Sequence, residues 1–548
     1  MRIKLEELLI LCELYDAVPV RTPKRVAVIY GFASKILENS KLNGREIIID
    51  VHDENIYQNT SFELTIENIA KLEQDLPKLN YLSALRKSIP QILIPTKYYC
   101  CGTFMNTISS YAILKLYTSD NILQARSNHC KCKKCKLVYY HGFCEDKISG
   151  RRIFDVDSLK VLIFNSSIGY EKVLLERLDS IICIGGVSFE KVCEIYCSGI
   201  KEENVYLNPD RLETAWFIFR MIEFVTVFES WPRKDKTKEL DVEQLCKTVY
   251  STIRNSIDKL WINHECEEPG CKERFIVIDG NEKLHRLICA AEKKHVIGNK
   301  GEVNSYELCV RNPLRGNQHH ANSKFCSIHN KEISGMTEEQ LDIRPITRLY
   351  AKRLNLADTL VSNEGCKKME NIDEFHSRTA GMFYIFRSCG IRLANFEMYT
   401  AESLSQIFLY LIDVFGEESD SNCLNGIVYD RACDLEPFIS RLKNEGNQAA
   451  KNFTKIKFMV DIFHVEKHSQ SKCLLGNEDC RYHPRLPRFE SVKGLNTEIA
   501  EQSFSRINPF KFMTRKMSYC RRLLFLKFID HSANKQIIKR LEKCIKNN

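Results

Sequence analysis

Acidic residues close short apolar runs at three places in the second half of this 548-residue chain. The run that starts at Arg274 ends in Asp279, and later runs end in Asp430 and Asp461. Short apolar runs bounded by turn residues are typical of buried strands. Carboxylates at the ends of neighbouring strands can converge, and Mg²⁺ prefers hard oxygen ligands. The pattern therefore indicates a divalent-cation site that includes Asp279 and Asp430.

A third carboxylate is expected in the helical stretch 496–504, which contains Glu498 and Glu501. These two glutamates are three residues apart and so share a helix face. We prefer Glu501, with Glu498 as the alternative. Three such acids can hold two divalent ions about 3.5–4 Å apart, which activate the attacking oxygen and stabilise the leaving oxygen in phosphodiester cleavage and strand transfer. Each acid alone is a common structural residue. The order of the secondary-structure elements therefore decides whether the three acids form a catalytic site.

The elements that carry these acids have a characteristic order. We predict strands at 274–279, 284–290, 381–386, 426–430 and 456–460, with a helix at 403–415 before the fourth strand. A hairpin, a third strand, a helix, two further strands and a late helix form the ribonuclease H fold. We therefore predict an α/β chain with a ribonuclease H-like core, a mixed sheet flanked by helices, together with zinc-binding cysteine-cluster insertions and a helical N-terminal region.

The 24 cysteines occur in clusters that favour zinc over disulfides, because the chain shows no secretory signal. In the first cluster, Cys132 and Cys135 have the two-residue gap of a zinc knuckle. Their expected partners are Cys100 and Cys101. Adjacent cysteines do not easily bind one ion, so the fourth ligand stays open, with His129 and Cys130 as competitors. The alternative is a set of reduced, partly buried thiols.

Two further groups have ligand types at short spacing. The second zinc site is predicted from Cys266, Cys271, Cys309, Cys326 and His329, with alternatives at His264, Cys289, His319 and His320. A possible third site comprises His464, His468, Cys473 and Cys480, with His483 nearby. The competing interpretations are surface cysteines in loops for the second group, and histidines that hydrogen-bond near the acidic site for the third.

Composition permits a nucleic-acid partner without demonstrating one. The chain is 44% hydrophobic and 28% charged, with a net charge of +9, and no run approaches the roughly 18 uncharged residues of a membrane span. We expect a soluble, intracellular protein.

Basic residues are dense near the C-terminus, where they either contact DNA or form a solvated helix face: Arg506, Lys511, Arg515, Lys516, Arg521, Arg522 and Lys527. Bound DNA would be held mainly through phosphates, so its affinity would fall steeply with salt.

Changes in pattern suggest five regions. They are residues 1–95, an α/β region of unknown role; 96–255, the first cysteine cluster with a helical region; 256–330, the second cluster around the first catalytic strand; 331–530, the rest of the core; and 531–548, a basic tail.

Four motifs resemble the core of the KDZ (Kyakuja-Dileera-Zisupton) transposases. They are Ile278-Asp279-Gly280-Asn281-x-Lys283-x-x-Arg286, Tyr429-Asp430-Arg431-Ala432-Cys433-Asp434-Leu435, Phe463-His464-x-x-x-His468 and Asn496-Thr497-Glu498-x-x-Glu501-Gln502-x-Phe504-Ser505. The cysteine clusters near 96–215 and 255–330 are similar to domains associated with these transposases. The resemblance covers roughly residues 95–530, and the order of the motifs makes it specific.

The resemblance implies a DDE-type enzyme that acts on DNA ends in the nucleus, and a homo-oligomer on DNA is the expected assembly. Asp279, Asp430 and Glu501 would form the catalytic triad with Mg²⁺ or Mn²⁺, and zinc would be structural. The sequence departs from the family at Gln502 and Phe504, where an arginine and a tryptophan are expected. These departures favour the alternative, a catalytically inactive or domesticated zinc-dependent DNA-binding protein derived from a transposon. A weaker alternative is a zinc-scaffolded interaction protein that does not bind nucleic acid.

Overall fold

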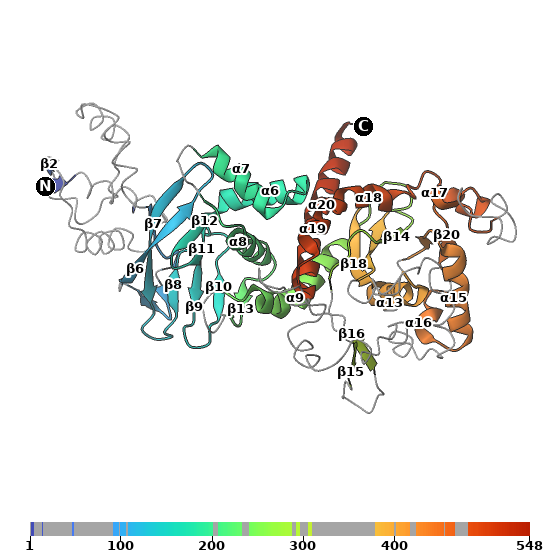
Figure 1. Ribbon diagram of the computed structural model, residues 1–548, viewed down its shortest axis with the longest axis horizontal. Coiled ribbons are helices and arrows are strands. Elements are labelled where there is room, and N and C mark those ends of the chain that lie inside the picture. Colours follow the sequence, from blue (N-terminus) through green and yellow to red (C-terminus); the bar gives the residue numbers. More distant parts are fainter. Residues whose placement is uncertain are drawn as a thin grey trace, which may run out of the picture. The chain divides into compact units, whose positions relative to one another are not determined.

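The computed structural model divides the chain into two compact units (Figure 1). Unit 1 comprises Met1–Ile181 and Phe189–Leu245, and unit 2 comprises Ile182–Ser188 and Cys246–Asn548. The structure describes residues 2–4, 14, 46–48, 91–97, 99–105, 108–200, 206–232, 240–287, 292–295, 305–308, 379–398, 402–416, 424–453, 455–465 and 480–547. Most of the predicted region 1–95 lies outside them. Within this region, β2 (Glu46–Ile48) pairs with β1 (Arg2–Lys4).

Unit 1 is built on a nine-stranded sheet in the order β11-β12-β6-β7-β8-β9-β10-β13, with β3 paired to β7. Its strands are β3 (Gln91–Leu93), β6 (Ile108–Tyr117), β7 (Ile122–Lys131), β8 (Val138–Tyr140), β9 (Phe143–Glu145), β10 (Arg152–Phe154), β11 (Val161–Asn165), β12 (Ile168–Glu171) and β13 (Val227–Phe228). A separate hairpin joins β4 (Tyr99–Cys100) to β5 (Thr103–Phe104). This sheet was not anticipated from the sequence.

Helices α6 (Lys172–Gly185), α7 (Phe189–Gly199) and α8 (Pro209–Met221) follow the strands, and α9 (Val242–Trp261) leads into unit 2. Helix α8 begins with proline at its first position, after Asn208, whose side chain accepts the Arg211 backbone N–H. The helical region expected within 96–255 corresponds to these helices, although β13 lies between α8 and α9. The apolar run at 161–164 is not helical: it belongs to β11, the edge strand that pairs with β12.

Unit 2 contains a five-stranded mixed sheet in the order β18-β17-β14-β19-β20. The strands are β14 (Phe275–Asn281), β17 (Gly381–Arg387), β18 (Arg392–Met398), β19 (Gly426–Val428) and β20 (Lys457–Met459). Strands β14, β17 and β18 pair antiparallel, whereas β14, β19 and β20 are parallel. The first four residues of β14 are buried, as expected for a central strand covered on both faces. A small hairpin joins β15 (Glu292–His295) and β16 (Ser305–Leu308).

Helices cover both faces of this sheet (Figure 1). Helices α13 (Leu404–Phe415) and α15 (Ala432–Asn444) share a hydrophobic core with Ile276 and Ile278 of β14. Helix α18 (Ile499–Ile507) packs on β14 and β17 from the opposite face, where Phe504 contacts the rings of Tyr384 and Phe386. Shorter elements are α16 (Gln448–Lys451), α17 (Ile462–Val465), η3 (Pro487–Val492), η4 (Asn508–Phe510) and α19 (Lys511–Thr514).

The predicted hairpin between β14 and a strand at 284–290 is wrong, because the two neighbours of β14 are β17 and β19. Residues 288–290 lie outside the described part of the chain. The third strand is instead β18, which the sequence did not reveal because it contains the polar residues Arg392, Asn395 and Glu397. All three are buried. Such a strand is stable only when its polar groups are paired.

The C-terminal helix α20 (Tyr519–Asn547) supplies those pairs. Asp530 accepts hydrogen bonds from Arg392 and Asn395, at 2.9 and 2.5 Å. Glu397 accepts two bonds from Arg286, at 2.7 and 2.9 Å, and a third from Arg522. Arg522 is therefore fully buried, so neither interpretation of the C-terminal basic residues, DNA contact or solvated helix face, holds there. Lys527 is likewise buried and paired, with Asp258.

Among the described residues, no helix combines the length and the apolar character needed to cross a membrane.

Candidate active site and metal clusters

Strand register brings three aspartates to one edge of the unit 2 sheet. Val277 of β14 pairs with Val428 of β19, which pairs with Met459 of β20, all in parallel. Two residues beyond this row come Asp279, Asp430 and Asp461. Because side chains alternate along a strand, each aspartate points to the same face of the sheet as the paired residue two positions before it. The three aspartates and Glu501 line one small cavity.

A fourth acid, Glu402, approaches from the α13 side. Carboxylate oxygens of Glu402, Asp279 and Asp430 lie within 4.8 Å of one another. Glu402 immediately precedes Ser403, the N-cap of α13, and the Tyr429 hydroxyl donates a 2.8 Å hydrogen bond to it. Gly280 provides the space, because a Cβ at this position would overlap the Glu402 Oε2 atom. Sequence reasoning missed Glu402, since it precedes a helix rather than ending a strand.

Crowding of these acids raises their pKa values. Burial, followed by the charges of Glu402 and Asp430, holds the pKa of Asp279 well above its usual range. Burial and the charge of Asp430 raise the pKa of Glu402 to about 7, although the Tyr429 hydrogen bond opposes this. Burial also raises the pKa of Asp430. Carboxylates placed this closely are stabilised either by protons or by a cation.

Glu501 reaches the same edge from the opposite face of the sheet. It forms a second ligand group with Asp461 and His464, again with ligand atoms within 4.8 Å. The His464 Nδ1 atom lies 2.7 Å from Asp461 Oδ2 and 3.9 Å from Glu501 Oε1, and the hydrogen bond to Asp461 raises the pKa of His464. Glu498 is exposed at the N-cap position of α18 and does not line the cavity.

The two departures from the family motif point away from the acids. Gln502 is exposed, and its side chain accepts a 3.0 Å hydrogen bond from Asn496. Phe504 packs edge-on against the rings of Tyr384 and Phe386, with centroids 5.8 and 5.9 Å away, and so attaches α18 to β17. An aromatic residue thus fills the position where tryptophan is expected, and neither residue lines the cavity.

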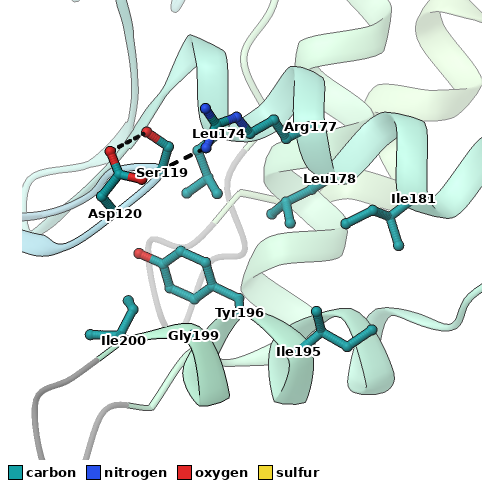
Figure 2. A pocket seen from close by; sticks show the side chains of 10 residues that line it. All are labelled: Ser119, Asp120, Leu174, Arg177, Leu178, Ile181, Ile195, Tyr196, Gly199 and Ile200. Carbon is teal, nitrogen blue, oxygen red and sulfur yellow. Dashed lines mark hydrogen bonds and ion pairs between the residues drawn. The ribbon is translucent and has the colours of Figure 1, made fainter.

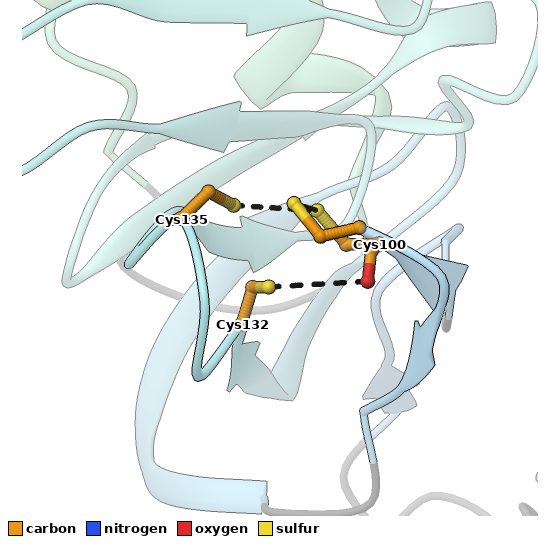
Figure 3. Close-up of side chains that lie close together, drawn as sticks. Cys100, Cys132 and Cys135 are labelled. Carbon is orange, nitrogen blue, oxygen red and sulfur yellow. Dashed lines mark hydrogen bonds between the residues drawn. The ribbon is translucent and has the colours of Figure 1, made fainter.

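The first cysteine cluster brings together all four predicted residues. Cys100, Cys101, Cys132 and Cys135 have sulfur atoms within 4.8 Å of one another. Figure 3 shows Cys135 facing Cys100, with their sulfurs 3.3 Å apart. Adjacent cysteines can share the cluster because Cys101 has a φ of 51° and Gly102 of 71°, which makes a tight turn between β4 and β5. Cys100 and Cys101 can therefore both face one ion although they are adjacent.

The turn at Cys132 favours a thiolate. Hydrogen bonding from the backbone N–H of Cys135 lowers the pKa of Cys132 to about 6, and the N–H of Lys134 adds to it. Neither competitor belongs to the ligand group: Cys130 packs beside Cys132 but burial raises its pKa to about 12, and the His129 ring stacks on Tyr140 with centroids 5.2 Å apart. Thiolates at two-residue spacing with backbone donors are the usual arrangement of a zinc knuckle.

The second cluster differs from the predicted ligand set. Cys266 and Cys271 lie together, but their neighbours are His264 and Cys389, with all ligand atoms within 4.8 Å. Sequence reasoning gave His264 as an alternative and did not include Cys389. The remaining predicted residues lie outside the described part of the chain: Cys289, Cys309, His319, His320, Cys326 and His329.

The predicted third site stays a prediction. His464 contacts Asp461 and Glu501, while Cys480 is buried in the unit 2 core. His468 and Cys473 lie outside the described residues.

Unit 1 also has a cleft of about 270 Å³ between α6, α7 and the β6–β7 turn (Figure 2). Leu174, Leu178 and Ile195 make its wall largely apolar. Its charged residues, Asp120 and Arg177, are exposed and 3.8 Å apart, and the Tyr196 hydroxyl donates to the Thr118 carbonyl. This cleft offers no buried titratable pair among its lining residues, so the acidic edge of unit 2 remains the candidate for chemistry.

Comparison with known proteins places the acidic edge in a family. Residues 272–534 match the family model of the Kyakuja-Dileera-Zisupton transposase, KDZ. The matched range contains Asp279, Asp430 and Glu501. The chain therefore carries a KDZ transposase family domain over these residues. No curated protein and no solved structure matches the chain.

Proposed function

We propose that this protein is a metal-dependent transposase with a ribonuclease H-like core that cleaves and joins DNA through a DDE-type triad. Asp279, Asp430 and Glu501 are the triad, and Glu402 and Asp461 complete the acidic edge. The observation that carries the proposal is the strand register, which sets three aspartates side by side at the carboxyl edge of β14, β19 and β20. A strand order of 3-2-1-4-5, counting from β14 as the first strand of the core, supports the fold assignment.

The donors fit magnesium or manganese. They are hard oxygens, and their crowding raises the pKa of Asp279 and of Glu402 unless a cation compensates the charge. Asp279, Asp430 and Glu402 would hold one ion, with Glu501 available from α18, which lines the same cavity as the aspartates. Bound divalent ions supply activation of the attacking oxygen and stabilisation of the leaving oxygen at a phosphodiester.

The chain's own residues position these ligands. Tyr429 orients Glu402 by its hydrogen bond, and Gly280 leaves room for that side chain. His464 bonds Asp461 through both its ring and its backbone N–H, at 2.7 and 2.9 Å, and so fixes the carboxylate next to Glu501. Supporting hydrogen bonds of this kind set the orientation of metal ligands.

Structural zinc at Cys100, Cys101, Cys132 and Cys135 is part of the proposal, supported by four converging sulfurs and a lowered pKa at Cys132. DNA is the partner that the transposase family domain implies. We also propose the nucleus as the compartment. A homo-oligomer on DNA is consistent with the family.

DNA cleavage and joining in Mg²⁺ or Mn²⁺ tests the proposal. We expect the wild type to be active and Asp279→Asn, Asp430→Asn and Glu501→Gln each to lose activity by about 10³-fold or more, because each removes a metal-ligand charge with little change in volume. Glu498→Gln is the matched control on the same helix and should remain within about threefold of wild type.

Zinc content should be unchanged in the inactive variants, and none of them should unfold at a lower temperature than the wild type, which separates lost chemistry from lost structure. A wild type that binds DNA but neither cuts nor joins it would instead establish the alternative, a catalytically inactive DNA-binding descendant. Full activity of Asp279→Asn would overturn the triad.

A further inference from the structure

We propose that His264, Cys266, Cys271 and Cys389 bind one structural zinc ion that locks the start of the catalytic strand β14 to the turn between β17 and β18. This site goes beyond the proposed reaction and does not depend on it. It also replaces the ligand set that the sequence suggests for Cys266 and Cys271.

Geometry favours a metal over a disulfide. The sulfurs of Cys271 and Cys389 are 3.9 Å apart. A tetrahedral zinc with Zn–S bonds of about 2.3 Å has sulfurs about 3.8 Å apart, whereas a disulfide requires about 2.05 Å. All three cysteines are free thiols. Four ligands complete a tetrahedron and leave no position for substrate, which is the property of a structural site.

Burial excludes a reactive-thiol role for Cys271 and Cys389. Cys271 is 0% exposed and Cys389 is 4% exposed. Reactive cysteines need solvent access, and a lone buried thiol behaves as a small apolar residue. Here, however, Cys389 meets two other thiols and an imidazole from a segment more than a hundred residues earlier in the chain. Convergence of four soft or borderline donors at one point matches zinc ligation.

The surrounding contacts already hold the two segments together. The Ser388 hydroxyl donates to the Pro269 carbonyl at 2.8 Å, and Arg387 donates to the Ile262 carbonyl at 2.7 Å. Gly270 has a φ of 81° and its carbonyl accepts the Phe275 backbone N–H at 2.7 Å, which turns the chain directly into β14. A zinc ion here would fix the β14 start, and hence the register that places Asp279.

The proposed zinc ligands extend beyond the residues that match the family. The family match begins at residue 272, so only Cys389 lies inside it, whereas His264, Cys266 and Cys271 precede it. The structural domain therefore extends upstream of the matched range. Cys309, Cys326 and His329 are not needed for this site.

Zinc content of the purified full-length chain tests the site. We expect Cys389→Ser to contain one zinc equivalent fewer than the wild type by elemental analysis. The matched control is Cys246→Ser, a buried cysteine of α9 in the same unit and outside every metal-ligand cluster among the described residues. The control should keep the wild-type zinc content. Unchanged zinc in Cys389→Ser would overturn the proposal.

A second measurement avoids any variant and decides the question if Cys389→Ser fails to fold. The folded wild type is alkylated with and without a zinc chelator, and each cysteine is quantified by peptide mass spectrometry. We expect Cys266, Cys271 and Cys389 to become reactive together when the chelator is present, while Cys246 stays unchanged. Equal alkylation of those three thiols with and without chelator would contradict the site.

Discussion

Strand β14 carries a different cluster of metal-ligand residues at each end. Its start follows Cys271, which meets His264, Cys266 and Cys389, whereas Asp279 near its end meets four other acids. Sulfur and imidazole suit zinc in a closed tetrahedron, while carboxylates suit Mg²⁺, which keeps positions for water and substrate. One strand thus separates a cluster suited to structure from a cluster suited to catalysis, and the donor atoms indicate which is which.

Substitutions at the two ends of β14 should change the free energy of unfolding in opposite directions, and this is the largest effect we expect. Cys389→Ser should lower the free energy of unfolding by about 4 kcal/mol or more, because zinc binding contributes directly to folding. Asp279→Asn should raise it in zinc-loaded, magnesium-free protein at pH 8, because asparagine places no ionisable group among the buried acids that raise the pKa of Asp279. Thermal or denaturant unfolding checks both. A stabilised Cys389→Ser, or a destabilised Asp279→Asn, would remove the distinction between the two ends.

A smaller effect, on DNA cleavage, tests whether Gly280 provides the space that the Glu402 side chain needs. Gly280→Ala places a Cβ against the Glu402 carboxylate, so we expect DNA cleavage to fall by about 10–100-fold, the range typical of displaced metal-supporting groups. Gly199→Ala at the end of α7 is the control, since a Cβ there meets nothing within 4 Å. The two variants are compared in the same Mg²⁺-dependent cleavage assay. Full activity of Gly280→Ala would show that Glu402 does not contribute.

The sequence predicted the parts of the site that depend on local pattern. Asp279 and Asp430 each follow their own apolar strand, so both are visible without tertiary information. The pattern also indicated Cys100, Cys101, Cys132 and Cys135 as the first cysteine cluster but left its fourth ligand open, because only the left-handed turn at Cys101 explains how two adjacent sulfurs converge.

Other parts depend on contacts between distant segments and were missed. Cys389 joins Cys266 and Cys271 across more than a hundred residues. Glu402 depends on the space beside Gly280 and on the Tyr429 hydroxyl. Strand β18 looks too polar to be a buried strand, because the Asp530 and Arg522 side chains that pair with it come from the last helix.

Manganese binding to the protein without DNA tests the central claim most directly, because it needs no knowledge of the natural DNA ends. The pKa of Glu402 is about 7, and burial among the other acids holds the pKa of Asp279 well above its usual range, so the metal-free cluster retains protons that unfolded acids would have lost. Its stability therefore falls as pH rises from about 4.5 through 7. A bound cation should displace these protons.

Calorimetry at pH 6.5 in two buffers of different ionisation enthalpy measures both the affinity and the protons released. We predict that zinc-loaded wild type binds Mn²⁺ with proton release, that affinity increases as pH rises through 7, and that Asp279→Asn and Asp430→Asn lose the binding. Absence of Mn²⁺ binding in the wild type, or unchanged binding in both variants, would contradict the assignment of the acidic edge as the catalytic metal site.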